Sequence, residues 1–286
     1  MKKHDNLKSS KEYKLGTDHF VEEPLLYVKM EHPKIFKRIL KGIHFSEKCI
    51  CFVSSRGLKF TNCLTNSSSS SCFIPKLMFE VFRLLPEEIY FQLNLTLLLE
   101  FLQIFGNSPN HLTLFINYRK HAPLMLVLEE HGVVIEGTIS TQYPYETLDF
   151  AFEKESILCH FVLKPESLKD IISHLDMNNT ILEIQLSPKE QLLRFLSKGA
   201  LGHCQIDIHN NPDNFEKMKF YSPLQESSFV YKLSSLKNFS KALQYALKSS
   251  FRINNGGMLC IQFIINSEVN KVGFIEFLSV PLEANI

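Results

Sequence analysis

Hydrophobic residues recur at two different spacings along this chain, and stretches of the two kinds alternate. Apolar positions three and four residues apart predict four amphipathic helices. We expect these helices over Pro33 to Ile43, over Leu95 to Phe105, from Pro165, and from Ser234 or Ser235. Proline suits a first helical turn, asparagine at 94 suits a cap, and glycine at 42 and 106 suits helix ends. The last two helices are expected to bury Leu168, Ile171, Ile172, Leu175, Leu236, Phe239, Leu243 and Leu247.

The stretches between the helices alternate every second residue, which is typical of strands. Turn signals separate several of these runs and predict hairpins. The turns are expected at Arg56-Gly57, at Glu130 to Gly132, at Ser187 to Glu190 and at Asn255 to Gly257. Each half then reads strand, helix, several strands, helix, several strands. We predict an α+β protein made of two similar domains.

Composition and proline positions divide the chain into four segments. The polar, lysine-rich residues 1–22 are predicted to be disordered. A first domain is expected over 23–140, a connector over 141–148, and a second domain over 149–286, because Pro144 prevents a central strand from continuing. The low-complexity run from Asn66 to Ser71 predicts a flexible loop.

Composition narrows the function classes. Hydrophobic residues make up 45% and charged residues 21%, as in soluble globular proteins, and the formal net charge is +1. Any nucleic-acid contact must therefore come from charge gathered on one face. The seven cysteines have scattered spacing, which favours reduced thiols in a nuclear or cytosolic protein. We expect neither a secretory signal nor a membrane span, and no long tail after the last strand.

Three long segments carry a family resemblance: LNLTLLLEFLQIFGNSP from Leu93, PLMLVLEEHGVVIEGTISTQYPYETLDF from Pro123, and LKPESLKDIISHLDMNNTILEIQLSP from Leu163. Across roughly Tyr27 to Pro281, the chain resembles the Rad-one subunits of the heterotrimeric nine-one-one DNA-damage checkpoint clamp. These subunits belong to the PCNA-like sliding-clamp family.

The resemblance implies a specific architecture and role. It implies two sliding-clamp domains, with helices that line a central hole around duplex DNA and antiparallel sheets outside. It implies a non-catalytic subunit that joins two different clamp subunits and contacts DNA without sequence specificity. A dedicated clamp loader, repair enzymes and checkpoint mediators are the further partners implied. The expected location is the nucleus, and neither cofactor nor metal is expected.

Basic residues gather on the predicted helices. Four of them share one stripe of the first helix, opposite its apolar face, and no acidic residue accompanies them. Such a stripe is typical either of a solvated helix face or of a surface that faces phosphates. Given the resemblance, we expect the basic residues of three helices to face DNA: Lys34, Lys37, Arg38, Lys41, Lys169, Lys237, Lys241 and Lys248.

The resemblance also assigns two subunit-joining edges and a partner-binding connector. The edges are strands 133–139 and 202–208, with contacts expected from Val133, Ile135, Gly137, Ile139, His203, Gln205 and Asp207. The alternative is two ordinary strands in a covered sheet. Partner peptides are expected at the connector near Tyr143, Tyr145 and Leu148, although these side chains fit equally well as packing for the linker.

Catalytic signatures are weak. The sequence has neither a phosphate loop nor a nucleophile elbow, although one sequence does not exclude a catalytic triad. His203, Cys204 and His209, and the pair Cys159-His160, lack zinc-site spacing. The alternatives are a homotrimeric replication clamp and a metal-dependent 3′–5′ exonuclease. The exonuclease would draw on the carboxylates of Glu87, Glu88, Glu129, Glu130, Asp149 and Glu153.

Overall fold

The computed structural model describes residues 23–65, 67–106, 111–144, 152–175, 180–199, 202–221, 226–266 and 272–282. Residues 1–22, predicted to be disordered, lie outside this part. The helices are α1 (Lys34–Gly42), α2 (Leu95–Phe101), α3 (Pro165–His174) and α4 (Leu233–Leu243), with short 3₁₀ turns at Lys76–Met78 and Lys154–Ser156. None of the described helices has the length and apolar character needed to cross a membrane.

The strands fall into two series with the same order around the helices. The first series comprises β1 (Leu26–Glu31), β2 (Lys48–Ser54), β3 (Gly57–Thr65), β4 (Ser68–Pro75), β5 (Val81–Leu84), β6 (Glu88–Asn94), β7 (Thr113–Tyr118), β8 (Leu124–Glu130) and β9 (Val133–Ile139). The second comprises β10 (Ile157–Leu163), β11 (Ile181–Ser187), β12 (Leu192–Gly199), β13 (Gly202–His209), β14 (Phe215–Phe220), β15 (Ser227–Lys232), β16 (Ala246–Asn254), β17 (Leu259–Asn266) and β18 (Val272–Ser279).

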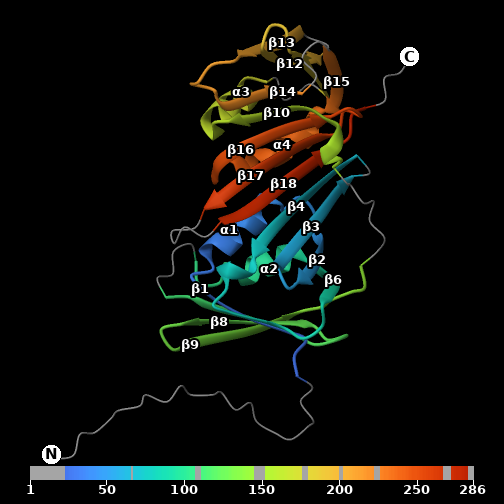
Figure 1. Cartoon of the computed structure of the whole chain (residues 1–286). Helices are drawn as coiled ribbons and strands as arrows, with labels where there is room; N and C mark the ends of the chain where they lie inside the picture. The colour runs from blue at the N-terminus through green and yellow to red at the C-terminus, as the bar shows by residue number, and fades with distance from the viewer. Residues whose placement is uncertain are drawn as a thin grey trace, which may run out of the picture.

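The strand orders show the same duplication. The sheet β5-β1-β7-β8-β9 matches β14-β10-β16-β17-β18, and β4-β3-β2-β6 matches β13-β12-β11-β15. Two of these four sheets are fused, because β18 pairs with β4 and gives one nine-stranded antiparallel sheet, β14-β10-β16-β17-β18-β4-β3-β2-β6 (Figure 1). The predicted duplicated α+β architecture is therefore present.

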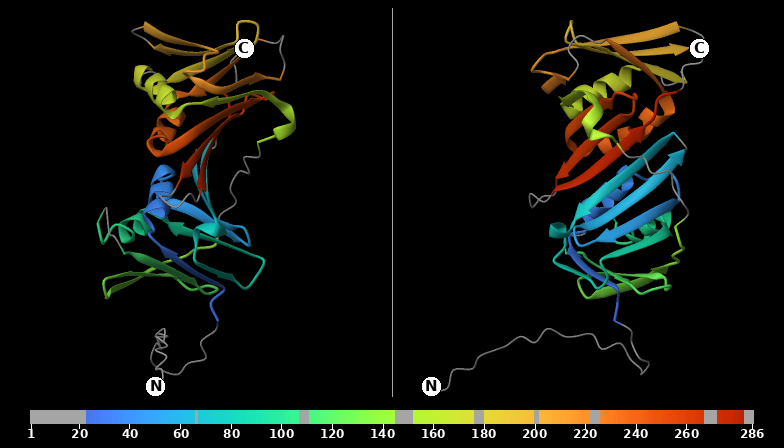
Figure 2. Two further views of the ribbon diagram at one scale, coloured as in Figure 1. Left: turned by 60° about the vertical axis from the view of Figure 1, so that its left-hand side comes forward. Right: turned by 45° about the vertical axis from the view of Figure 1, so that its right-hand side comes forward.

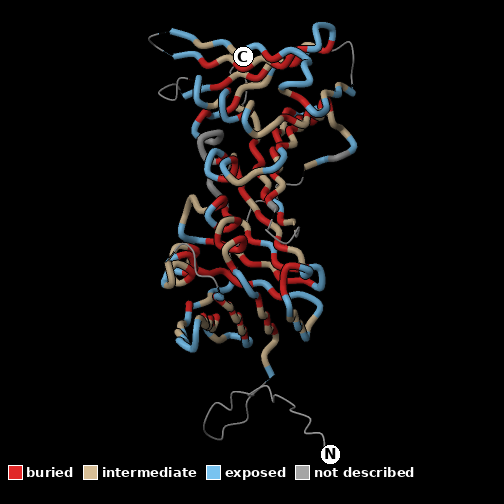
Figure 3. The backbone as a smooth tube through the Cα atoms, turned by 90° about the vertical axis from the view of Figure 1, so that its left-hand side faces the viewer, coloured by how far each residue is buried: buried red, intermediate tan, exposed pale blue. Residues whose placement is uncertain are grey.

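All four helices lie on one side of the sheets, as Figure 2 shows in its left view. Their apolar faces and the inner faces of the sheets form one buried core that continues through both halves (Figure 3). Aromatic rings bridge the halves: Phe45 stacks edge-on against Phe277, which in turn contacts Phe239 and Phe263. Burial of these large apolar side chains stabilises the contact between the halves, together with the pairing of β18 with β4.

Close approach of α1 to α4 depends on a glycine. A Cβ on Gly42 would stand 2.5 Å from Cδ1 of Ile275 and 3.3 Å from Cβ of Ala242, so a side chain at this position would push the helices apart. The glycine predicted as a helix end therefore also serves as a contact point between the halves.

Most local predictions are confirmed. Pro33 is the N-cap residue of α1, Pro165 opens α3, and the Asn94 side chain accepts a hydrogen bond from the Leu97 amide at 3.1 Å. The predicted hairpin turns join β2 to β3, β8 to β9, β11 to β12 and β16 to β17. At the β8–β9 turn, His131 and Gly132 both have positive φ, as a two-residue hairpin turn requires.

Three local predictions are wrong. The serine run does not form a loop: its residues from Ser68 onward belong to β4, and Ser70 is fully buried between β3 and β18. Cross-strand pairing on both sides overrides the low-complexity signal. The second helix ends at Phe101 instead of Phe105. Leu247 is exposed, because α4 ends at Leu243 and the chain re-enters the sheet as β16.

Candidate functional site: basic helices, open sheet edges and connector

The basic stripe of α1 is only partly open. Lys41 is exposed, and Lys34 and Arg38 are half-buried. Lys37 is buried, with only 7% of its surface exposed to solvent. Its ammonium donates to Oε1 of Gln103 at 3.0 Å and to the carbonyl of Gly106 at 3.1 Å. The prediction that Lys37 faces DNA is therefore wrong: the side chain turns toward the segment after α2 and fixes it to α1.

The environment of Lys37 explains this role. Burial lowers the pKa of the Lys37 ammonium, and repulsion from the other three basic side chains of α1 lowers it further. Two neutral oxygen acceptors satisfy the buried donor, which would otherwise destabilise the fold. The helical spacing that suggested one stripe could not reveal that the Gln103 amide and the Gly106 carbonyl, both in the segment after α2, reach Lys37.

The neighbouring basic residues lie where α1 meets α4. The Arg38 guanidinium lies over the Tyr245 ring, 5.7 Å from its centre, and Lys241 donates to the His44 carbonyl at 3.0 Å. Lys241 also lies 5.0 Å from the centre of the Phe45 ring. Cations from both halves therefore gather on the helix side of the molecule, across the contact between the halves.

The other predicted DNA-facing residues have three different outcomes. Lys169 is exposed on α3. The side chain of Lys237 lies outside the described residues. Lys248 is not on α4, as the prediction required: it lies in β16 and forms an ion pair with Glu216. The apolar pattern ending in Leu247 had extended the predicted helix too far.

Both predicted joining strands are edge strands. β9 ends the five-stranded sheet, and β13 ends the four-stranded sheet. On β9, Val133 is 55% exposed, Ile135 and Gly137 are half-buried, and Ile139 is buried. Among the described residues, no further strand pairs with β9 or β13, so each strand presents one unpaired backbone edge.

The side chains of β13 are more polar. His203, Gln205 and Asp207 are all exposed on one face. Asp207 accepts two hydrogen bonds from the Arg194 guanidinium, at 2.6 and 2.9 Å, and two more from Gln205. The Arg194 guanidinium lowers the pKa of the Asp207 carboxyl, so this edge carries an organised carboxylate.

The beginning of the connector is fixed to the sheet. Gln142 exchanges backbone hydrogen bonds with Gln92 of β6 at 2.8 and 2.9 Å, and the two side chains are bonded at 3.2 Å. The next residue, Tyr143, is 89% exposed. Tyr145 and Leu148 lie outside the described residues. The packing alternative therefore does not hold for Tyr143.

An apolar row that the sequence analysis missed crosses the outer face of the nine-stranded sheet, on the side away from the helices. Its members are cross-strand neighbours on β6, β2, β4, β18 and β17. On β3, between β2 and β4, the position in the row is occupied by Lys59. They are Tyr90, Phe52, Phe73, Phe274 and Ile264, of which Tyr90 is 54% and Phe274 is 42% exposed. Contiguous exposed apolar groups are typical of interaction surfaces. The row requires the pairing of β4 with β18, which alternation within single strands cannot reveal.

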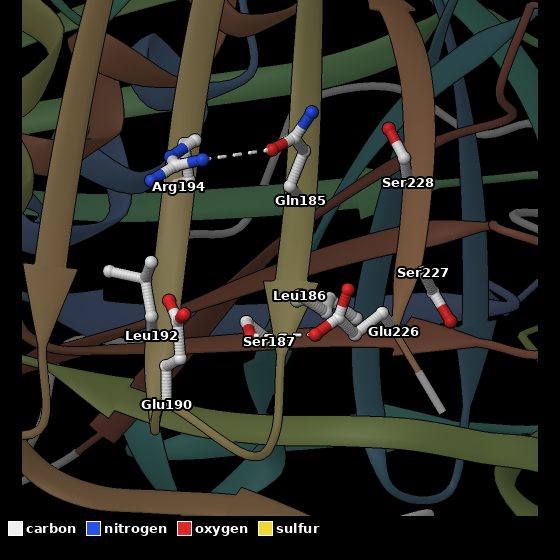
Figure 4. Close-up of a pocket in the computed structure, with 9 residues that line it drawn as sticks. All are labelled: Gln185, Leu186, Ser187, Glu190, Leu192, Arg194, Glu226, Ser227 and Ser228. Atoms are coloured by element: carbon white, nitrogen blue, oxygen red, sulfur yellow. Dashed lines mark hydrogen bonds between the residues drawn. The ribbon is translucent and has the colours of Figure 1, made fainter. Parts of the chain in front are cut away.

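A shallow depression of about 340 Å³ lies on the outer face of the sheet β13-β12-β11-β15 (Figure 4). Polar side chains line it together with Leu186 and Leu192; Arg194 donates to Gln185 at 3.5 Å, and Ser187 donates to Glu226 at 3.4 Å. Near it, Glu183 accepts bonds from Gln185, Ser228 and Lys198, which lower its pKa to about 2. These contacts form a polar network that links β11, β12 and β15.

The carboxylates considered for a nuclease do not converge. Glu88 is on β6 of the nine-stranded sheet, whereas Glu129 and Glu130 end β8 of the five-stranded sheet. Asp149 lies outside the described residues. Within the described part of the chain, no three His, Cys, Asp or Glu side chains come close enough to hold a metal ion. Cys159 and Cys260 are buried in the sheet, and burial raises the pKa of each thiol to about 12.

Comparison with known proteins agrees with this geometry. The family model described as repair protein Rad1/Rec1/Rad17 matches residues 25–265. The chain belongs to the Rad1 family. Cell cycle checkpoint protein RAD1 of Homo sapiens is 35% identical over 262 residues, which cover 90% of this chain and 92% of that protein. The RAD1 of Mus musculus is 35% identical over 92% of this chain and 94% of its own length.

A more distant relative and a solved structure are also similar to this chain. The RAD1 homolog mrt-2 of Caenorhabditis elegans is 27% identical, covering 91% of this chain and 95% of its own. The solved structure of Proliferating Cellular Nuclear Antigen from Entamoeba histolytica superposes with a TM-score of 0.71 at 16% identity, covering 91% of this chain and 99% of that one. This Rad1 family member therefore has the PCNA-like sliding-clamp fold and is a checkpoint clamp subunit.

Proposed function

We propose that this Rad1 family chain is the non-catalytic member of a ring of three different subunits that encircles duplex DNA at damaged or stalled sites in the nucleus. A dedicated loader places the ring on DNA, and the ring then recruits checkpoint mediators and repair enzymes. One observation carries the proposal. The chain contains one strand-to-strand joint between its two halves, and the strands equivalent to the two strands of that joint are open edges.

The internal joint is the pairing of β18 with β4, from Phe274–Phe73 to Ser279–Ser68. By strand order, β18 corresponds to β9, and β4 corresponds to β13. The same kind of backbone pairing is therefore available twice more, once at each end of the chain's sheets. Two open edges at opposite ends make a link in a ring.

The two open edges do not suit each other well. The pairing registers of the two halves align Val134 with Phe274 and Asp207 with Phe73. A ring made of copies of this chain alone would therefore set Val134 opposite the charged Asp207, where the internal joint pairs two phenylalanines, Phe274 and Phe73. This mismatch favours two different partner subunits over the homotrimeric replication-type clamp.

The helix side supplies the surface for DNA. Lys34, Arg38 and Lys41 of α1 and Lys241 of α4 gather there without a recognition motif, which suits contacts to phosphates and movement along the duplex. Lys169 and Lys237 of the other half complete the proposed set. The exposed Tyr143 and the outer apolar row support the role as a docking platform.

Native mass spectrometry tests the assembly. We expect the chain alone to be monomeric and to form a one-to-one-to-one complex when it is co-expressed with the other two checkpoint-clamp subunits of the same organism. A homotrimer of the chain alone would instead establish the replication-type clamp. A monomer that ignores both partners would refute the ring.

A second experiment tests the DNA-facing surface. In the assembled complex, Lys41→Glu combined with Lys241→Glu should reduce retention on duplex DNA and lower the salt-dependence slope by about one for each lost phosphate contact. Ring assembly should remain intact. Lys59→Glu, on the opposite sheet face, is the matched control. Equal loss for the control, or unchanged retention for the double variant, would contradict the assignment.

A further inference from the structure

The outer face of β14, β10 and β16 carries a cluster of cations for which neither the DNA-facing helices nor the joining edges account. Cross-strand pairing places Lys219 beside His160, and His160 beside Arg252. Lys217 lies next along β14 on the same face, with Nζ 3.5 Å from Nδ1 of His160. Both lysines are exposed. We call Lys217, Lys219, His160 and Arg252 the outer cationic cluster.

Among the described residues, no carboxylate forms an ion pair with the cations of the cluster, although Lys219 lies 4.3 Å from the centre of the Tyr221 ring and Arg252 lies 5.5 Å from that of Phe152. The Nε2 of His160 lies 3.1 Å from the Ser250 hydroxyl. Arg252 donates to the Cys260 thiol at 3.5 Å, which is a weak acceptor, and its Nε has no partner among the described residues. Burial lowers the pKa of His160, and repulsion from the cluster's other three members lowers it further, with no carboxylate acting against them.

The first half of the chain provides an internal comparison. The equivalent strands there are β5, β1 and β7, and Arg83, Tyr27 and Asn117 occupy the positions of Lys219, His160 and Arg252. On that face, the central cation Lys29 is paired with two carboxylates, Glu80 at 2.9 Å and Glu31 at 3.2 Å. The same architecture thus carries neutralised charge in one half and concentrated positive charge in the other.

The geometry of the strand identifies the kind of ligand. β14 is an edge strand, so its outer backbone edge can pair with an added extended segment. Lys217 and Lys219 are two residues apart and point to one face, so their spacing matches alternate side chains of a peptide strand. Duplex or single-stranded DNA has no backbone amides that could use this edge.

We propose that the edge of β14 binds an extended acidic segment of a partner protein, with Asp or Glu at every second position. The added strand pairs with the backbone of β14, and its carboxylates lie over the outer cationic cluster. This site lies on the opposite face from the helices and does not require the ring. The internal joint uses β4 of the first half, and Arg83 on β5 of that half stays exposed. By strand order, β13 and β14 correspond to β4 and β5. A ring joint made at β13 in the same way therefore leaves the β14 face open.

Fluorescence anisotropy with the full-length chain tests this site. The probe is a labelled ten-residue peptide in which valine and glutamate alternate. Lys217→Glu combined with Lys219→Glu should weaken its binding by about tenfold or more, because two attractive contacts become repulsive. Arg83→Glu, at the position equivalent to Lys219, is the matched control and should change the affinity less than about twofold.

Two competing probes separate specific from general attraction. A peptide of the same composition with its glutamates in one block should bind several-fold more weakly, since it cannot place a carboxylate at every second position. A single-stranded oligonucleotide should not compete with the alternating peptide. Equal affinity for both peptides, effective competition by the oligonucleotide, or equal loss in Arg83→Glu would overturn the proposal. Thermal melting of each variant identifies any loss that comes from unfolding.

Discussion

The two open edges of this chain have the same place in matching sheets, yet their surfaces differ. The β9 edge begins with apolar side chains: Val133 and Val134 are 55% and 42% exposed, and the exposed Glu136 and Thr138 follow them. The β13 edge has His203, Gln205 and Asp207, with the carboxylate already bonded to Arg194. Duplication supplied the same backbone geometry twice, and side chains then differentiated the two edges. Partner choice can therefore be encoded without any change in fold.

The largest effect is expected from charging the β9 edge. Val133→Asp combined with Val134→Asp should weaken assembly at β9 by about a hundredfold, because two desolvated apolar contacts become buried charges. The β13 neighbour should remain bound, so native mass spectrometry should detect a two-subunit species.

Leu77→Asp is the matched control, since Leu77 is 81% exposed and lies on no sheet edge. If the three-subunit complex of the double variant survives unchanged, β9 is not a joining edge.

A smaller effect is expected from adding a methyl group at Gly137. A Cβ there would stand 2.5 Å from Cε2 of the Phe101 ring, so Gly137→Ala should displace that ring from beneath β9. We expect a loss of about 1–2 kcal/mol in the free energy of unfolding, measured by urea denaturation, together with weaker assembly at this edge.

Combining Gly137→Ala with Phe101→Leu should restore part of the assembly, because the smaller side chain removes the clash. If the double variant assembles no better than Gly137→Ala alone, the clash with the Phe101 side chain does not explain the assembly defect.

The smallest effect is expected from changing Glu183, which lies on β11 in the polar network of the four-stranded sheet. Glu183 has a pKa of about 2, lowered chiefly by bonds from Gln185 and Ser228. A lowered pKa stabilises the fold above the pKa of the unfolded state, near 4.3, and this contribution disappears as the pH falls toward 2. Glu183→Gln should therefore cost about 1 kcal/mol at pH 7, and the difference from the parent chain should shrink between pH 4 and pH 2.

Urea denaturation at several pH values measures this difference. Glu190→Gln is a suitable control, because Glu190 is exposed in the nearby β11–β12 turn. A pH-independent difference for Glu183→Gln would contradict the assignment of the stabilisation to its ionised form.

Much of the fold could be predicted from the sequence, because local signals and tertiary packing agree there. Pro33, Pro165 and Asn94 occupy the helix starts they were expected to occupy, and the hairpin turns lie where predicted. The failures come from contacts between distant segments. Ser70 is buried because β18 pairs with β4, and Lys37 is buried because Gln103 and Gly106 reach it. The proposed edges could be located through the family resemblance, whereas their chemical contrast required knowledge of which side chains are exposed.

The nine-stranded sheet also has a mechanical consequence. It carries hydrogen bonds without interruption from one half to the other, and aromatic rings and the close approach at Gly42 reinforce the crossing on the helix side. Both the continuous strand pairing and the packed helix side oppose a hinge motion between the two halves. If three such chains form a ring, we expect it to open at a seam between two chains before any one chain bends at its middle.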